Sequence, residues 1–426
     1  MTTPHDTTAG RATTAAVHHL SPEQLQDAGA GYAGIRAREG LPHVVLPGLR
    51  TPVRLVTRYE DVKAALTEPR LVRDRGKVPG GAEGPDAQAE LLESLSEYPP
   101  EYAQFVVGHL ALFDGEDHAR RRAPLTRAFT ARRIASLRTF VEEAAARLIS
   151  GLAAKEEADL LGEFAYPLAT SVICELVGVE EADRVRVCEW IRDFAYGDGS
   201  RMGEGLVGIV EYVRALIERR KAEPADDLVS ALVEAVREGG PDALTEDEVV
   251  AMVFLLIDTG ITPPALFLAH AALALLDRPD QSALLREEPG LLARAVPELL
   301  RHITLVRIGA SMYATEDFAF AGSDLRKGET VTVALLAANH DPAAYGEGCE
   351  RLDITREAGR GEGHLAFGHG AHYCIGAALG RLVTSVVLDG LFVRREAPVL
   401  AVGRDELEFG HWPGDGFHLL RLPVRL

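Results

Sequence analysis

Hydrophobic positions recur at spacings of three and four residues over most of the chain between about residues 118 and 300. In the segments 134–154 and 204–222 the apolar side chains return to one face of a helix. Before this part, the short apolar runs HVVLPG and TPVRLVT predict two strands of a small sheet. Residues 76–100, rich in Gly, Pro and acidic side chains, predict a long mobile loop. The pattern therefore predicts a mainly α-helical protein with a small β region.

The segment 245–281 differs from the other helical segments because apolar residues occupy every face of the predicted helix. Thr245 and Glu248 have the spacing of a capping box at its start. A helix that is apolar all round is buried on all sides. At roughly 1.5 Å per residue, this helix is long enough to be the central beam of the protein. Later segments predict helices over 289–302 and 374–393, strands at 318–321 and 329–335, and a strand-rich end.

The chain contains no linker that would divide it into separate folding units. Residues 1–19 are rich in Thr and Ala and have no apolar core, so they predict a disordered tail, with neither a signal peptide nor a membrane anchor. Residues 20–426 are expected to form a single domain. Asp258 and two prolines interrupt the most apolar stretch, 251–276, which favours a buried core helix over a membrane span.

Composition narrows the classes of function. The 426 residues contain 45 Lys and Arg against 64 Asp and Glu, a formal net charge of −19, and such a surface repels phosphate backbones. Cys174, Cys188, Cys349 and Cys374 are too few for a disulfide framework, and none has the spacing of a zinc site. A protein that binds no nucleic acid and no membrane, in a reducing cytoplasm, is expected.

The strongest local signal for chemistry is the run FGHGAHYCIG, residues 367–376. Cys374 lies just before a predicted helix, so the positive end of the helix dipole favours its thiolate, which is a good soft ligand for iron. Glycines at 368, 370 and 376 let the backbone turn tightly and approach a flat partner closely. An isolated cysteine in a glycine-rich turn is more often a packing residue.

The surrounding residues reverse that expectation, because the run resembles the haem-binding signature of the cytochrome P450 family, FxxGxxxCxG. Phe367, Gly370, Cys374 and Gly376 match every fixed position. The resemblance implies the cytochrome P450 fold, with haem b (iron protoporphyrin IX) buried between the central helix and the Cys374 loop. It also implies that Cys374 is the axial iron ligand, with Phe367 and Gly376 beside the cofactor.

Other segments resemble the same family in the same order. Glu298 and Arg301 match its ExxR helix, where the resemblance implies a buried ion pair, and Arg351 is the expected third member. His118, Arg122 and His372 match residues that contact the haem propionates in bacterial members. A further propionate arginine of the family is replaced by Met312, for which Arg307 is a candidate substitute.

The central helix departs from the family pattern, AGx(D/E)T. The ungapped register places Thr259 and Gly260 on the first two residues, Thr262 on the acid and Pro263 on the alcohol. Pro263 and Pro264 cannot donate amide hydrogens to the carbonyls four residues earlier, so a kink or an opened groove is expected. Protons for catalysis must then come from Asp258, Thr262, ordered water or the substrate. Gly260 and Pro263 complete the set of expected catalytic positions.

The resemblance thus implies a monooxygenase-type oxidoreductase that oxidises a small apolar organic molecule, by analogy in a tailoring step of secondary-metabolite biosynthesis. A ferredoxin and a ferredoxin reductase are the implied electron donors, and a monomer is expected. Two alternatives stay open. One is a family member that catalyses oxidative ring closure, coupling, rearrangement or a peroxide-dependent oxidation. The other, a non-catalytic helper protein, is less favoured because the haem cysteine is present.

Overall fold

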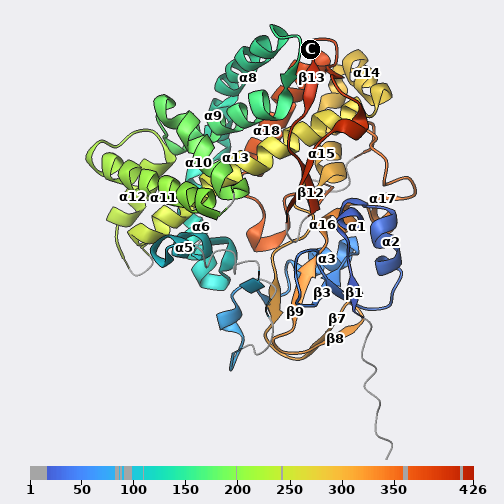
Figure 1. Cartoon of the computed structure of the whole chain (residues 1–426). Coiled ribbons are helices and arrows are strands. Elements are labelled where there is room, and N and C mark those ends of the chain that lie inside the picture. The colour runs from blue at the N-terminus through green and yellow to red at the C-terminus, as the bar shows by residue number, and fades with distance from the viewer. Residues whose placement is uncertain are drawn as a thin grey trace, which may run out of the picture.

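The computed structural model describes residues 17–81, 86, 89–90, 98–108, 110–197, 199–240, 243–357, 363–412 and 416–426. Helices make up the larger body, and a small β region lies at one side of it (Figure 1). The predicted class, mainly α with a small β region, is confirmed. Of the expected disordered tail, residues 1–16 lie outside the described residues, whereas His18–His19 already form strand β1. The folded part therefore begins before residue 20.

The largest sheet joins the N-terminal segment to strands from the second half of the chain. Its six strands lie in the order β1-β2-β3-β9-β6-β4, with bounds His18–His19, His43–Val45, Val53–Val56, Thr330–Val333, Met312–Ala314 and Leu71–Val72. The two predicted N-terminal strands are confirmed, and they pair antiparallel as β2 and β3. β9 then pairs with β3 in parallel, which brings the chain after the helical body back against its beginning.

Three smaller sheets complete the β region. The hairpin of β7 (Phe318–Phe320) and β8 (Ser323–Leu325) confirms the strand predicted at 318–321. In the second small sheet, β13 lies between β10 and β5, whose bounds are Pro423–Arg425, Val399–Leu400 and Ala158–Asp159. The third is the hairpin of β11 (Phe409–Trp412) and β12 (Gly416–Leu419).

The helical body follows the predicted periodicity closely. Its helices are α5 (Pro100–Val107), α6 (Gly115–Ala128), α7 (Ala131–Ser136), α8 (Arg138–Ala153), α9 (Tyr166–Val177), α10 (Arg184–Tyr196), α11 (Gly199–Ala222), α12 (Leu228–Arg237), α13 (Glu246–Leu276), α14 (Pro279–Glu287), α15 (Leu292–Ile303) and α18 (Ala377–Leu388). Short helices cover the β region: α1 (Pro22–Gln26), α2 (Ala30–Arg36), α3 (Tyr59–Ala65), α16 (Leu335–Asn339) and α17 (Pro342–Tyr345). The segment 134–154, predicted as one helix, is divided at Leu137 into α7 and α8.

Helix α13 is the predicted central beam and crosses the helical body (Figure 1). The predicted capping box is confirmed, because the Thr245 hydroxyl accepts from the Glu248 amide at 3.2 Å and the Glu248 carboxylate accepts from the Thr245 amide at 2.9 Å. The helix packs against α9, α10 and α11. A Cβ atom on Gly260 would lie 2.5 Å from the Ile173 side chain of α9, so only glycine permits this approach.

The two prolines do not interrupt α13, which is helical without a break from Glu246 to Leu276. The expected opening of the helix is therefore limited to the loss of the amide donors at Pro263 and Pro264, which leaves the carbonyls of Thr259 and Gly260 without helical partners. By length and composition, α13 and the segment Leu160–Val177 could cross a membrane. Both are mostly buried inside the protein, as core helices are.

A buried ion network fixes α15 to the loop that leads to Cys374. Arg301 donates to both carboxylate oxygens of Glu298 at 2.8 Å, and both side chains are almost fully buried. Arg301 also donates to the carbonyls of Asn339 and Cys349 at 2.7 and 2.9 Å. The prediction of Arg351 as the third member is wrong. That side chain is exposed beside Glu350, and Arg356 contacts Glu298 instead, at 3.3 Å.

This network generates a stability prediction. Substituting Arg356→Ala removes a charge-assisted contact to the buried Glu298 carboxylate, so we expect a loss of about 1.5–3 kcal/mol in the free energy of unfolding. Arg351→Ala is the matched control and should cost less than about 1 kcal/mol, because its ion pair is solvated. Urea unfolding of both variants measures the difference, and equal losses would contradict the assignment of Arg356.

Candidate functional site

Cys374 lies in a tight loop that ends at the start of α18. The Cys374 amide donates to the Phe367 carbonyl at 2.9 Å, which closes the loop. Gly368 and Gly370 adopt left-handed backbone conformations, with φ of 72° and 73°. A Cβ atom on Gly370 would lie 2.8 Å from the Leu66 carbonyl oxygen, so this glycine also permits a close approach to the end of α3. The thiol is thereby presented from a rigid turn at the N-terminal end of a helix.

A cavity of about 390 Å³ separates the Cys374 loop from α13. Gly260 and Pro263 line it on the α13 side, opposite Phe367, Cys374 and Gly376. Its other lining residues are almost all apolar: Phe129, Ala169, Val172, Ile173, Leu256, Phe267, Leu268, Leu300, Leu305, Val306, Leu335, Leu379 and Val383 among them. Five of the predicted site residues are thus brought together around one apolar space.

The predicted propionate contacts form a basic cluster beside the Cys374 loop. The rings of His118 and His372 lie 4.0 Å apart between centroids. His118 is buried, and its Nε2 atom has no hydrogen-bond partner among the described residues. Burial and the neighbouring His372 and Arg122 lower the pKa of His118 to about 4. Arg122 donates to the Tyr373 carbonyl, directly before Cys374.

Arg73 also belongs to this cluster, although no motif pointed to it. It acts electrostatically on both His118 and His372, and burial lowers its pKa to about 10. Its guanidinium donates to the Ala111 carbonyl at 3.0 Å. The cluster contains one carboxylate, Asp114, which lies 3.9 Å from His372 and accepts from the Arg73 amide at 2.7 Å.

Met312, which stands where the family has a further propionate arginine, is a packing residue. Met312 is buried in the core of the large sheet. Arg307, the candidate substitute, donates to the carbonyls of Leu305 and Phe417 at 3.5 and 3.3 Å. It therefore points toward β12, whereas Arg73 joins Arg122 beside the two histidines.

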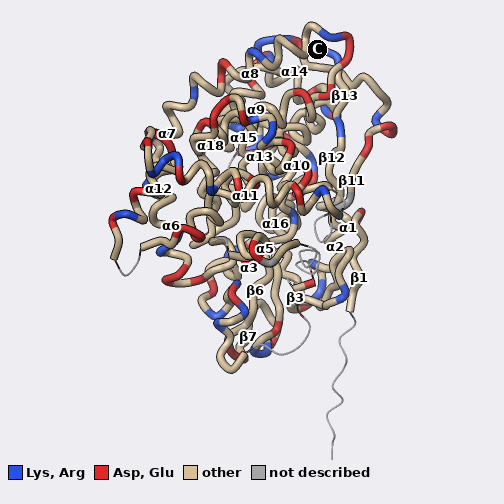
Figure 2. Tube along the Cα trace, turned by 60° about the vertical axis from the view of Figure 1, so that its left-hand side comes forward, with Lys and Arg blue, Asp and Glu red and all other residues tan. Residues whose placement is uncertain are grey.

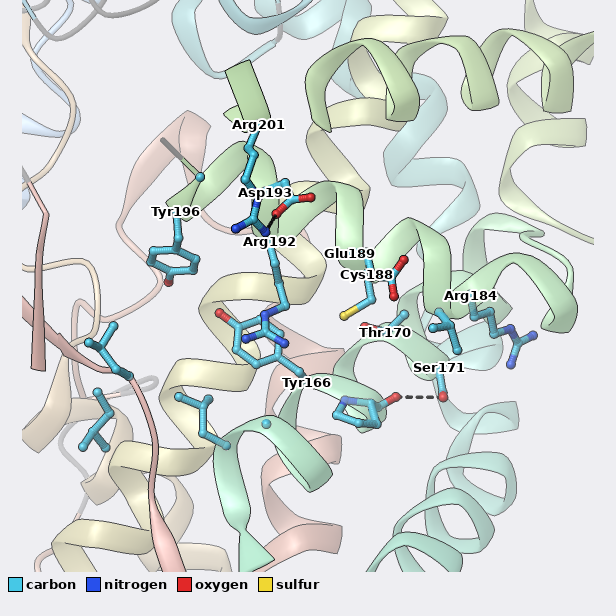
Figure 3. Close-up of a pocket in the computed structure, with 17 residues that line it drawn as sticks. Tyr166, Thr170, Ser171, Arg184, Cys188, Glu189, Arg192, Asp193, Tyr196 and Arg201 are labelled. Atoms are coloured by element: carbon cyan, nitrogen blue, oxygen red, sulfur yellow. Dashed lines mark hydrogen bonds and ion pairs between the residues drawn. The ribbon is translucent and has the colours of Figure 1, made fainter. Parts of the chain in front are cut away.

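Asp258 and Thr262 lie on α13 but are not among the residues that line the cavity of Cys374, whereas Gly260 and Pro263 are. Thr262 is buried beside the phenol of Tyr166, and Asp258 interacts electrostatically with Tyr196 at the end of α10. Burial raises the pKa of Asp258 to about 7. Tyr166 and Tyr196 line a second pocket of about 740 Å³ between α9 and α10 (Figure 3). The α13 carboxyl and hydroxyl therefore lie near this second pocket.

The residues fit the cofactor that the sequence resemblance implies. A thiol at one wall of an apolar space suits ligation of the iron of a porphyrin. The orphaned Nε2 atom of His118 and the cations Arg73 and Arg122 suit the two carboxylates of such a ring. The three remaining cysteines are weaker candidates, because burial raises the pKa of the thiols of Cys174, Cys188 and Cys349.

Comparisons with known proteins agree with this geometry. A family model described as "Cytochrome P450" matches residues 187–394. Cytochrome P450 107B1 of Saccharopolyspora erythraea is 40% identical over 358 residues, which cover 83% of this chain and 85% of that protein. The 6-deoxyerythronolide B hydroxylase of the same organism is 33% identical over 368 residues, covering 84% and 88%. The ligand-free structure of the P450 monooxygenase TamI has a TM-score of 0.82 and 32% identity, covering 96% of this chain and 94% of that one.

The basic cluster generates a prediction on cofactor retention. If Arg73 holds a haem carboxylate, Arg73→Leu should accelerate haem transfer to excess apomyoglobin about tenfold, since a charge-assisted hydrogen bond contributes about 1.5–3 kcal/mol. Arg70→Leu is the control, because it removes an arginine of the same segment that pairs with Glu68. Transfer at the same rate from the Arg73 variant and the unaltered protein would contradict this role.

Proposed function

The chain belongs to the cytochrome P450 family, and we propose that it is a monooxygenase that oxidises a small apolar organic molecule in a tailoring step of secondary metabolism. As a member of this family it is an oxidoreductase with the P450 fold, and it binds haem b through a cysteine thiolate. The cavity between Cys374 and α13 is the observation that carries the proposal. The substrate class is supported by relatives named 6-deoxyerythronolide B hydroxylase and mycinamicin IV hydroxylase/epoxidase.

We assign the following roles to the residues of this chain. Cys374 would hold the iron of the cofactor through its thiolate, and Arg73, His118, Arg122 and His372 would hold the cofactor carboxylates. When bound, haem b would supply the iron for oxidation by dioxygen, and the Cys374 thiolate would donate electron density to that iron. The apolar walls exclude water and orient an apolar substrate in the cavity. Phe367 and Gly376 shape the thiolate side of the cavity.

Proton delivery differs from the family pattern because Pro263 has no hydroxyl and Thr262 has no carboxyl. We propose that protons enter from the second pocket, where the Tyr166 phenol lies beside the buried Thr262 hydroxyl. The unpaired carbonyls of Thr259 and Gly260 can accept hydrogen bonds from water, which extends this route toward the cavity. Asp258 is the other group on α13 that can hold a proton near neutral pH.

Electrons are proposed to come from a ferredoxin with its reductase, and the protein is proposed to work in the cytoplasm as a monomer. Basic residues follow one another along α6 and α7 (Figure 2). Arg120 and Arg121 pair with Glu248, so they are partly neutralised. Arg127 and Arg132 are exposed and supply the free positive charge that an acidic electron carrier would contact.

A second candidate function rests on the same prolines. Without the acid and alcohol of the family pattern, oxidative ring closure, coupling, rearrangement or a peroxide-dependent oxidation is the alternative to hydroxylation. A non-catalytic helper role is disfavoured, because Cys374 lines the cavity and the rings of His118 and His372 lie together beside the Cys374 loop.

The visible spectrum of the reduced protein under carbon monoxide tests the proposal first. We expect a strongly red-shifted Soret band of the thiolate type, and a band of the imidazole type for Cys374→His, because the ligand at position 374 sets the electron density at iron. Cys188→Ala is the control and should leave the band unchanged. Folded, unaltered protein that binds no haem would support the helper role instead.

Replacing Pro263→Thr tests the altered proton delivery. The variant restores a hydroxyl toward the cavity, so the hydrogen peroxide released per NADH, with a surrogate ferredoxin and reductase, should change by at least about threefold. Pro264→Thr is the matched control, since it removes the neighbouring proline and restores an amide donor at the next carbonyl. If Pro263→Thr behaves like the unaltered protein, position 263 does not shape the reaction.

A further inference from the structure

The second pocket, between α9 and α10, is a cavity with a lining of its own. Its volume of about 740 Å³ exceeds the 390 Å³ of the Cys374 cavity, and no described residue lines both. Helix α9 forms a wall of each, because Tyr166 and Thr170 border the second pocket while Val172 and Ile173 border the other. Cavities of about 300–1,000 Å³ are typical of small-molecule sites. The second pocket can therefore hold an organic ligand that does not enter the Cys374 cavity.

The mouth of the second pocket is lined by exposed apolar side chains. Val185 is 70% exposed, Leu420 is 49% exposed and Tyr196 is 41% exposed, and these three residues form what we call the apolar rim. They are three of the eight exposed large hydrophobic side chains in the part of the chain that the structure describes. Exposed apolar side chains that gather around a pocket are typical of a surface that another molecule covers.

Arg192 is a cation of this pocket that no described acid neutralises. Its guanidinium lies over the Tyr166 ring, with 4.9 Å between the guanidinium carbon and the ring centroid (Figure 3). It makes no hydrogen bond and no ion pair with any described residue. Its charge acts on the phenols of Tyr166 and Tyr196 and on the thiol of Cys188. The positive charge is therefore available to a ligand that lies against the two tyrosines.

The other charged residues of the lining do not offset this cation at the tyrosine end of the pocket. Two further arginines are neutralised by carboxylates, in the pairs Arg184–Glu175 and Arg201–Asp193. Glu189 is exposed and lies about two turns of α10 before Tyr196, whereas Arg192 lies about one turn before it. The tyrosine end therefore combines aromatic surface with one unpaired positive charge, which favours an anionic ligand with an apolar body.

We propose that the second pocket binds a lipophilic carboxylate, whose anion is held by Arg192 and whose hydrocarbon body is covered by the apolar rim. A planar guanidinium can donate two parallel hydrogen bonds to a carboxylate, and an aromatic ring of the ligand can stack on the exposed ring of Tyr196. The site goes beyond the proposed function, because its ligand does not occupy the Cys374 cavity. Since protons are proposed to enter from this pocket, a bound carboxylate would slow turnover by covering Tyr166.

Two probes with the same ring system test the inference on the holoprotein: 2-naphthoate and 2-naphthalenemethanol. Their dissociation constants are measured by equilibrium dialysis, with and without saturating 4-phenylimidazole, which ligates the haem iron and fills the space beside it. We expect 2-naphthoate to bind about tenfold more tightly than the alcohol, because only the anion gains a charge-assisted contact with Arg192. The affinity for 2-naphthoate should be the same when the iron ligand is present.

Variants of α10 identify the group that holds the anion. Arg192→Leu should abolish the preference for the carboxylate and leave the affinity for the alcohol unchanged. Arg186→Leu is the matched control, because it removes an exposed arginine of the same helix that lies 5.0 Å from the Trp190 ring centroid and is not among the residues that line the pocket. Glu189→Gln should retain the preference. Val185→Asn should weaken both probes alike, by about threefold, because it removes part of the apolar rim.

Three outcomes overturn the inference: a naphthoate affinity no greater than that of the alcohol, a preference that survives in Arg192→Leu, or displacement of naphthoate by 4-phenylimidazole. The first would show that the pocket does not select anions, the second would place the anion at another cation, and the third would place the probe in the Cys374 cavity. The reduced carbon monoxide spectrum of each protein is recorded beforehand. Absence of the thiolate-type band would contradict the proposed function, while dialysis would still report naphthoate binding, so the two failures are distinguishable.

Discussion

The burial of α13 is the constraint on which the rest of the structure depends. A helix of 31 residues with apolar side chains on every face is stable only when other elements cover most of its surface, and α9, α10 and α11 pack against it. The cavity exists because the neighbouring helices leave part of the surface of α13 uncovered at the middle of the helix. There the apolar series gives way to Asp258, Thr259, Gly260, Thr262 and Pro263, which are small, polar or unable to donate a backbone hydrogen bond.

Sequence patterns predicted the parts of the site that lie within one short segment. The Cys374 loop and the Glu298–Arg301 pair have fixed local spacing, and the periodicity of α13 is unmistakable, so their contacts could be anticipated. Arg356 and Arg73 could not be found in this way. Arg356 contacts Glu298, and Arg73 lies beside His118 and His372, which belong to distant segments of the chain. Local spacing therefore does not indicate these contacts, which depend on the tertiary fold. The prediction of Arg351 is wrong for this reason: it lies in the same segment as Arg356, but its side chain is directed toward solvent.

Charge is distributed unevenly around the cavity. The cations Arg73 and Arg122 and the carboxylate Asp114 lie beside the Cys374 loop, whereas the acid of α13, Asp258, lies near the second pocket. In an interior of low dielectric constant such fixed charges act over several ångströms with little screening. A molecule with a dipole or a localised charge would therefore have one preferred orientation in the cavity, even though almost all of the surface that it touches is apolar.

The contact between Gly260 and Ile173 has a consequence for anyone who wishes to redesign this protein. Because there is no room for even a methyl group at position 260, saturation mutagenesis there would sample variants that separate α9 from α13 before they reshape the cavity. Leu305 and Val306 border the same space from the segment after α15, and both positions already accommodate large side chains. To change substrate selectivity, substitutions should therefore be made in that segment, and Gly260 should be retained.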